Sequence, residues 1–154
     1  MNWGPPNLIH TSGADDKQAI AGDRTPTSPF YGRVYAAWDD RSNLAFARSL
    51  DNGRSWAGVG SSGAGTPLAN TSFSPEIAID QDGAIYIVWI TGNNLNLVQS
   101  TDGGDTFTAP MPVVRGLTPL ASPPLSAPNG FPDRDSIAIF KCFSGQLHPK
   151  QSGR

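Results

Sequence analysis

The sequence contains a single cysteine, Cys142, among its 154 residues. An internal disulfide and a cysteine-based zinc cluster are therefore excluded, and the redox compartment stays undetermined. Charged residues are also scarce, at 16%, and the 11 Lys and Arg against 13 Asp and Glu form no basic cluster that could follow a phosphate backbone. Nucleic acid is accordingly not expected as a partner.

Long apolar runs are lacking as well. No stretch approaches the roughly 18 apolar residues of a membrane-spanning helix, and residues 1–6 lack the charged and apolar regions of a signal peptide. His10 and His148 are far apart and have no partner at ligand spacing. We expect no membrane span, no metal and no cofactor, and the chain itself leaves its localisation undetermined.

What the sequence does contain is turn residues, with 17 Gly and 14 Pro, and these favour an all-β fold. It also contains a repeat. Residues 33–56 align with residues 84–107 at a constant offset of 51 positions (84 − 33) and without a gap. The alignment pairs Val34 to Trp38 with Ile85 to Trp89, two runs rich in residues that favour strands.

Each repeat unit is predicted to hold four short strands separated by turns, which is typical of a propeller blade. The sequence therefore predicts an all-β, partial β-propeller of four-stranded antiparallel blades. Such a chain would be an excerpt of a longer protein, or would self-associate to complete a propeller. The expected parts are the last strand of a preceding blade (1–12), two blades (15–60 and 73–115), a Pro-rich link (116–134) and the start of a further blade (135–154).

A Ser/Thr-x-Asp-x-Gly-x-x-Trp/Phe pattern occupies the third turn of each unit. Its Asp can accept hydrogen bonds from turn amides, its Gly permits a positive φ, and its aromatic residue can pack back under the blade. The two copies consist of Ser49, Asp51, Gly53 and Trp56, and of Ser100, Asp102, Gly104 and Phe107. With this pattern in phase with the repeat, the sequence resembles the bacterial neuraminidase repeat family, in which the pattern is called the Asp box. That family includes sialidases and non-catalytic propellers.

The resemblance implies that the Asp boxes are structural and lie away from the substrate. In a four-stranded meander the turns alternate between two ends of the sheet, so a ligand would face the second turns and the links between blades. The candidates are the polar residues at these positions: Asp16, Lys17, Glu76 and Arg134 in the links, and Asp39, Asp40, Arg41 and Asn93 at the second turns. By position alone, Asp16, Asp39, Arg41 and Arg134 are the catalytic candidates carried over from the resemblance. Asp40, Lys17, Glu76 and Asn93 are the candidates for substrate binding, with a glycan as the expected partner. The alternative for the run from Asp39 to Arg41 is a solvated turn.

A retaining sialidase is expected, from the resemblance, to use an arginine triad, a Tyr nucleophile paired with a Glu, and an Asp acid/base. The family's Arg-Ile-Pro motif is absent, and Glu76 is the only glutamate. Two functions therefore stay open. One is a sialidase-like propeller that recognises or hydrolyses glycans as an exo-glycosidase, with a secreted or periplasmic parent. The other is a non-catalytic propeller segment that serves as a binding or scaffold module.

Overall fold

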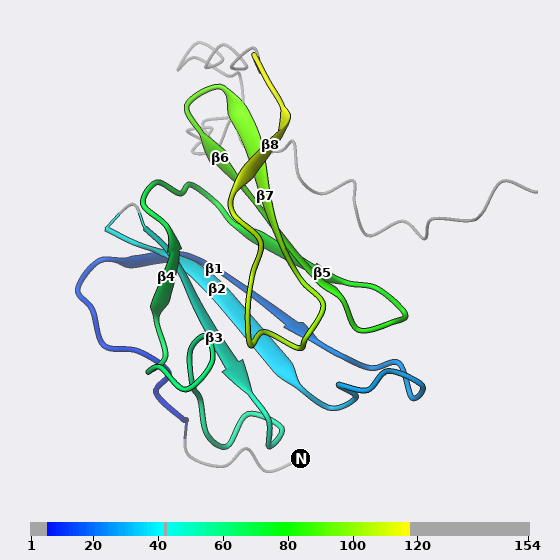
Figure 1. The fold of residues 1–154 in the computed structure, drawn as a ribbon. Coiled ribbons are helices and arrows are strands. Elements are labelled where there is room, and N and C mark those ends of the chain that lie inside the picture. Colours follow the sequence, from blue (N-terminus) through cyan, green and yellow to red (C-terminus); the bar gives the residue numbers. More distant parts are fainter. Residues whose placement is uncertain (1–5, 42, 118–154) are drawn as a thin grey trace, which may run out of the picture. The chain divides into compact units, whose positions relative to one another are not determined.

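The computed structural model describes residues 6–41 and 43–117 of the chain. Within them the protein is all-β and forms two four-stranded antiparallel sheets, each with its strands in chain order (Figure 1). The prediction of an all-β chain built from four-stranded antiparallel units is confirmed. The first sheet contains β1 (Asp15–Gly22), β2 (Val34–Asp40), β3 (Asn43–Ser49) and β4 (Thr66–Ala69); the second contains β5 (Glu76–Ile79), β6 (Ile85–Thr91), β7 (Asn94–Ser100) and β8 (Met111–Val114).

Strand register follows the repeat exposed by the sequence. Tyr35 of β2 lies opposite Arg48 of β3, and Tyr86 of β6 lies opposite Gln99 of β7, so both hairpins keep the offset of 51 residues. The described part of the chain holds no helix that is long and apolar enough to cross a membrane. The predicted link from residue 118 onward and the predicted further blade lie outside the described residues.

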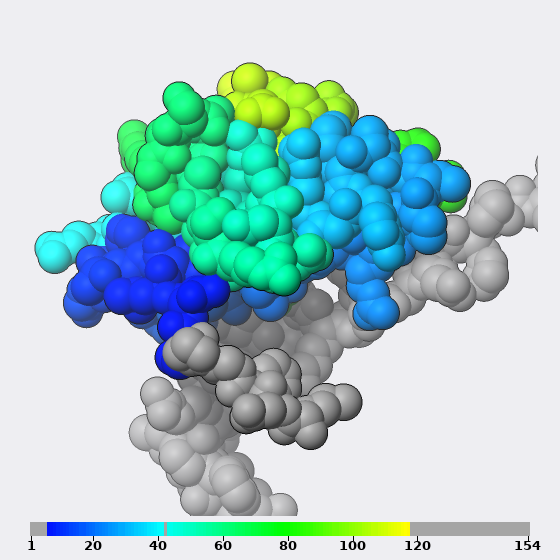
Figure 2. All heavy atoms as spheres, turned by 90° about the horizontal axis from the view of Figure 1, so that it is seen from below, coloured from blue at the N-terminus to red at the C-terminus, as the bar shows by residue number. Residues whose placement is uncertain are grey.

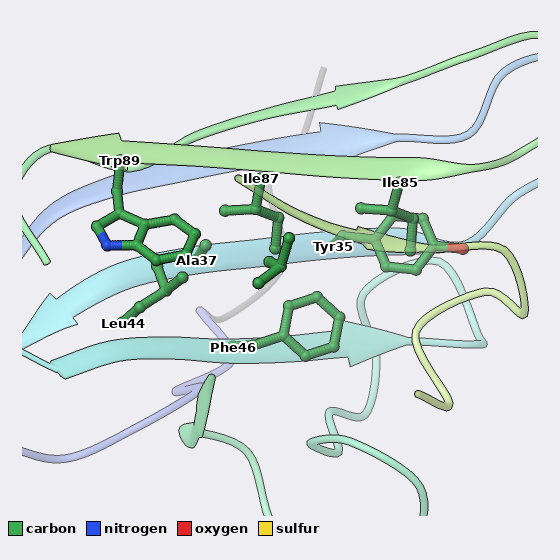
Figure 3. Packing of buried hydrophobic residues seen from close by; sticks show 8 residues of the cluster. Tyr35, Ala37, Leu44, Phe46, Ile85, Ile87 and Trp89 are labelled. Atoms are coloured by element: carbon green, nitrogen blue, oxygen red, sulfur yellow. The ribbon is translucent and has the colours of Figure 1, made fainter. Parts of the chain in front are cut away.

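The main hydrophobic core lies between the two sheets (Figure 3). The first sheet contributes Tyr35, Ala37, Leu44 and Phe46, and the second contributes Ile85, Ile87, Trp89 and Val98. Each fully buried large apolar side chain stabilises the fold by about 2 kcal/mol. Two successive meanders that pack face to face in this way have the arrangement of adjacent propeller blades.

The opposite face of the first sheet is covered by residues 6–12. Ile9 packs on the cluster formed by Ala36, Trp38, Ala45 and Ala47, and the segment, dark blue in Figure 2, lies against the first sheet. Asn7 Nδ2 donates to the carbonyl of Gly53 at 3.0 Å. The prediction of a strand over residues 1–12 is not met in residues 6–12, because they pair with no strand edge and pack through side chains instead.

Two boundaries differ from the sequence prediction. The fourth strand of the first sheet is β4, so this sheet runs past the predicted end at residue 60. After the bridge between Arg48 and Ala57 the chain leaves the sheet in a Gly- and Ser-rich loop and rejoins it opposite Phe46. The predicted link residues Asp16 and Lys17 belong to β1, because the strand pairs as far as Asp15 opposite Asp40, across a bulge between Asp16 and Ala19.

Candidate functional site

The turns of both sheets lie at two opposite ends. The first and third turns, which include both Asp boxes, form one end, called the box end. The second turns and the connection between β4 and β5 (70–75) form the other, called the link end. Apart from Arg134, which lies outside the described residues, the predicted site residues all lie at or next to the link end: Asp16, Lys17, Asp39, Asp40, Arg41, Glu76 and Asn93.

Asp39 is buried and binds the connection between the two sheets at the link end. Its Oδ1 accepts a hydrogen bond from Ser72 Oγ at 2.6 Å, and its Oδ2 accepts one from the amide of Ser74 at 3.0 Å. Both donors belong to the connection between β4 and β5, and only 7% of Asp39 is exposed. Its carboxylate is therefore engaged in fixing this connection.

The carboxylates of Asp15 and Asp40 lie on paired positions of β1 and β2, and residues 6–12 supply partners for both. His10 Nδ1 is 3.0 Å from Asp15 Oδ1, and Ser12 Oγ donates to Asp40 Oδ1 at 2.8 Å. Trp38 Nε1 also donates to Asp15 Oδ1, at 2.9 Å, and the His10 ring packs on Trp38 with 5.5 Å between centroids. In the fold, His10 therefore contacts the Asp15 carboxylate and the Trp38 ring, and the sequence alone did not predict these contacts.

His10, Asp15 and Asp40 offer potential metal-ligand atoms that lie within 4.8 Å of one another. Imidazole and carboxylate groups are common ligands of zinc and related ions. Here each carboxylate already accepts a hydrogen bond from Trp38 or Ser12. A hydrogen-bond network accounts for the arrangement, and we assign no metal to it.

Asp16 and Lys17 form an exposed pair at the β1 bulge. Lys17 adopts a positive φ of 54°, and its Nζ lies 3.3 Å from Asp16 Oδ2 and 5.7 Å from the centroid of the Phe73 ring. The hydrogen bond from the Lys17 amide, followed by that from Nζ, lowers the pKa of Asp16. Asp16 is consequently ionised at neutral pH and has no proton to donate.

Three further predicted residues are solvent-exposed. Arg41 follows β2 in the left-handed region, with a φ of 51°. Glu76 begins β5, and Asn93 lies in the two-residue turn between β6 and β7. The Asn93 carbonyl accepts a hydrogen bond from the Leu117 amide at 2.7 Å.

A pocket of about 400 Å³ opens towards the link end, between β4 and the second sheet. Its polar lining comes from Asn70, Thr71, Thr91 and Asn96, and its apolar lining comes from Leu68, Ala69, Trp89 and Pro110. Trp89 Nε1 donates to Thr91 Oγ1 at 3.1 Å, which fixes the indole at the pocket wall, and Thr91 Oγ1 donates in turn to the Thr71 carbonyl. The pocket therefore presents hydroxyl and amide groups in front of an indole that is itself buried in the core.

At the box end, each Asp box is a closed hydrogen-bond ring. Asp51 accepts hydrogen bonds from Ser49 Oγ, Ser55 Oγ and the amides of Arg54 and Ser55. Asp102 likewise accepts from Ser100 Oγ and from the amide and Oγ1 of Thr106. Burial alone would raise the pKa of Asp102, but the hydrogen bonds from Thr106 and Ser100 outweigh burial and lower it to about 2.

Because of this lowered pKa, the fold is expected to lose stability as the pH falls into the acid range. The contribution of Asp102 is fully present above its unfolded pKa, about 4, and is lost as the pH falls through its folded pKa. Because the group is largely solvated, we expect about 1 kcal/mol of unfolding free energy to disappear between about pH 4 and about pH 2. Urea denaturation measures this loss. Between about pH 4 and about pH 2 the Asp102→Asn variant should lose less unfolding free energy than the unchanged protein, and an equal loss in both would contradict the assignment.

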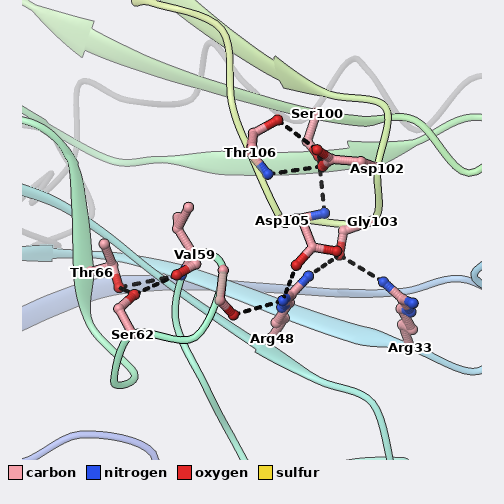
Figure 4. Close-up of polar contacts among 12 residues, drawn as sticks. Arg33, Arg48, Val59, Ser62, Thr66, Ser100, Asp102, Gly103, Asp105 and Thr106 are labelled. Carbon is pink, nitrogen blue, oxygen red and sulfur yellow. Dashed lines mark hydrogen bonds and ion pairs between the residues drawn. The ribbon is translucent and has the colours of Figure 1, made fainter.

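The sequence interpretation missed an arginine pair that connects the sheets at the box end (Figure 4). Arg33 Nη1 and Arg48 Nη1 each donate to the carbonyl of Gly103 at 3.1 Å, and Arg48 Nη2 contacts the Asp105 carboxylate. We call Arg33 and Arg48 the arginine clamp. The repeat carried a signal for it, since the positions equivalent to Arg33 and Arg48 in the second unit are Ala84 and Gln99.

The pocket residues were missed as well. Asn96 lies on the inward face of the second sheet beside apolar neighbours, opposite Trp89. Its equivalent in the first unit is Ala45. A polar residue at a core-facing repeat position is the signal that could have identified the pocket.

Comparison with known proteins gives distant structural similarity and no family assignment. No protein-family model and no curated protein matches this chain. Among solved structures, it is similar to a leech intramolecular trans-sialidase complexed with 2,7-anhydro-Neu5Ac, with 23% sequence identity and a TM-score of 0.48. The match covers 61% of this chain and 14% of that one, so this chain spans a small part of the length of the enzyme that it matches.

Proposed function

We propose that this chain is part of a β-propeller that binds a carbohydrate in the pocket at the link end. The observation that carries the proposal is the lining of this pocket, in which the amide and hydroxyl groups of Asn70, Thr71, Thr91 and Asn96 gather in front of the buried Trp89 indole. Amide and hydroxyl groups exchange hydrogen bonds with sugar hydroxyls in both directions, and the buried Trp89 indole behind them holds the Thr91 hydroxyl in place. A volume of about 400 Å³ is within the range of small-molecule sites.

The position of the pocket agrees with what the Asp-box resemblance implies, namely a ligand at the end opposite the boxes. Asn96 is the key residue in this proposal. Its carboxamide has two donors and one acceptor oxygen, and it makes a long hydrogen bond of 3.5 Å to the Asn94 carbonyl. This leaves most of its hydrogen-bonding capacity for a ligand.

Binding is proposed in preference to hydrolysis. The hydrolytic mechanism that the resemblance implies needs an Asp that acts as acid and base beside a Tyr nucleophile paired with a Glu. Asp39 is buried and occupied on both oxygens, and Asp16 has a lowered pKa and is paired with Lys17. Neither of these two candidate catalytic carboxylates is thus placed as a free acid, which favours the non-catalytic alternative.

The test is a glycan-array screen with the full 154-residue chain, followed by calorimetric titration of the best sugar. Asn96→Ala should weaken binding about tenfold, because one or two hydrogen bonds to the ligand are lost. Gln81→Ala, an exposed polar change at the box end, should leave the affinity unchanged. Binding that survives Asn96→Ala would overturn the pocket assignment, and loss in Asn93→Ala alone would move the site to the second turn.

Turnover is tested separately with a fluorogenic sialoside. We expect the full chain to release no fluorescent aglycone above the rate of a heat-denatured sample. Release that is abolished by Asp16→Asn or Arg41→Ala would overturn the preference for binding and restore the hydrolytic alternative.

A further inference from the structure

The hydroxyl groups that line the pocket at the link end form a chain of hydrogen bonds, and the direction of each bond can be worked out. Trp89 Nε1 is a donor only, so Thr91 Oγ1 accepts the bond of 3.1 Å between them. The Thr91 hydroxyl proton goes to the Thr71 carbonyl, 3.1 Å away, because a carbonyl can only accept. The bond of 3.2 Å between the two threonine hydroxyls is therefore donated by Thr71.

Both hydroxyl protons of this chain are thus used within the protein. Thr71 is solvent-exposed, and its Oγ1 keeps lone pairs that can accept a hydrogen bond from a ligand but has no proton left to donate. A sugar hydroxyl can donate to this oxygen. An ionised carboxylate has only acceptor oxygens and cannot. The position therefore favours a ligand that supplies a hydrogen-bond donor.

No charge in the lining offsets this preference. The eight described residues that line the pocket are all uncharged. Its other polar side chains are the carboxamides of Asn70 and Asn96, and Asn96 Nδ2 already donates to the Asn94 carbonyl at 3.5 Å. Protein sites that bind carboxylates commonly use Arg or Lys, whose hydrogen bonds are assisted by charge. Arg115 follows β8 and is exposed, but it is not one of the lining residues.

We propose that the pocket at the link end selects an uncharged saccharide and discriminates against sugars that carry a carboxylate, such as uronic and sialic acids. This inference rests on the proposed function and specifies the ligand class of the same site. A carboxylate that enters the pocket loses water without gaining a cation, and it meets the lone pairs of Thr71 Oγ1. A sugar hydroxyl in the same place donates to Thr71 and can accept from the Asn96 carboxamide.

Three forms of one sugar test the effect of charge alone. The probes are the methyl glycosides of glucose, galactose and mannose, each compared with its uronic acid and its uronamide by calorimetric titration of the full 154-residue chain at neutral pH. For at least one sugar, we expect the glycoside and the uronamide to bind with similar affinity and the uronic acid to bind at least about tenfold more weakly. Equal weakening of the acid and the uronamide would show that size excludes the group, and would overturn the inference.

Two variants of Thr71 test the direction of the hydrogen bonds. Thr71→Val keeps the shape of the side chain without its hydroxyl. It should weaken binding of the neutral glycoside about fivefold, because one hydrogen bond is lost, and it should reduce the discrimination against the uronic acid. Thr71→Ser keeps the hydroxyl and should leave both affinities unchanged. Discrimination that is the same in Thr71→Val as in the unchanged chain would contradict the role given to Thr71.

Failure of this inference and failure of the proposed function give different results. A uronic acid that binds at least as tightly as its neutral glycoside would overturn the inference and leave the proposed function in place, and loss of that binding in Arg115→Gln would identify the cation responsible. Absence of binding by every probe up to about 10 mM, where contacts with millimolar Kd are populated, would overturn the proposed function and this inference with it.

Discussion

Replacing Arg48 with alanine is expected to destabilise the protein by about 3 kcal/mol. The Arg48 side chain lies between the sheets and is almost fully buried. Its Nη1 donates to the Gly103 carbonyl at 3.1 Å, and its Nη2 donates to the Gly60 carbonyl at 2.8 Å and to Asp105. Truncation removes all these hydrogen bonds at once and empties a buried volume between the sheets, and hydrogen bonds made by a charged group contribute about 1.5–3 kcal/mol.

Urea denaturation monitored by tryptophan fluorescence measures this loss. Arg54→Ala is the matched control, because Arg54 is an exposed arginine in the first Asp box, and we expect a change within about 0.5 kcal/mol. Arg48→Lys should recover only part of the lost stability, since an ammonium group cannot hold two carbonyl groups and a carboxylate in a planar fork. An Arg48→Ala variant as stable as Arg54→Ala would show that the clamp does not hold the sheets together.

The glycines of the two Asp boxes should differ sharply in their tolerance of alanine. Gly104 has a φ of +85°, and a Cβ there would lie 2.9 Å from Phe46 Cζ and 3.3 Å from Arg48 Cδ. Gly53 has a φ of +86°, but its nearest neighbour would be Trp56 Cζ2 at 4.0 Å. Both substitutions incur about 1 kcal/mol of backbone strain, and Gly104→Ala adds about 2 kcal/mol of overpacking against buried groups.

The two variants control each other, because backbone conformation and residue change are the same in both. In thermal or urea unfolding, the unfolding free energy of Gly104→Ala should be about 2 kcal/mol lower than that of Gly53→Ala. Equal losses would mean that Phe46 and Arg48 move aside without cost and that the second Asp box is not seated tightly on the first sheet.

Much of the fold could be predicted because the same pattern of strand and turn residues occurs twice in the sequence, so that each copy supports the assignment of the other. Alternating and β-branched residues in the runs ending at Trp38 and Trp89, with turn residues between them, specify strands and hairpins. The constant offset then fixes register, since a slip of one residue would turn every core side chain outward. The segment 6–12 could not be predicted as it is, because its apolar residues cover a sheet face without joining a strand edge.

The candidate site was predicted less well, for a physical reason. Topology placed Asp39 and Asp40 correctly at the link end, but it could not show that Ser72 and Ser74 occupy the oxygens of Asp39. Such hydrogen bonds depend on the path of the connection from β4 to β5, which carries no periodic signal. Asn96 and Arg48 were missed because the offset comparison was used to find what the units share, whereas both residues mark where the units differ.

The difference at the arginine clamp also means that the two repeats are not interchangeable in the stack of sheets. If the two units exchanged places in space, Gln99 would face the turn that contains Arg54, and Arg48 would be separated from Asp105. The apolar positions would still match, but the ion pair between Arg48 and Asp105 would be gone. Apolar residues thus make neighbouring repeats compatible, and the charged residues beneath the second Asp box determine which repeat comes first.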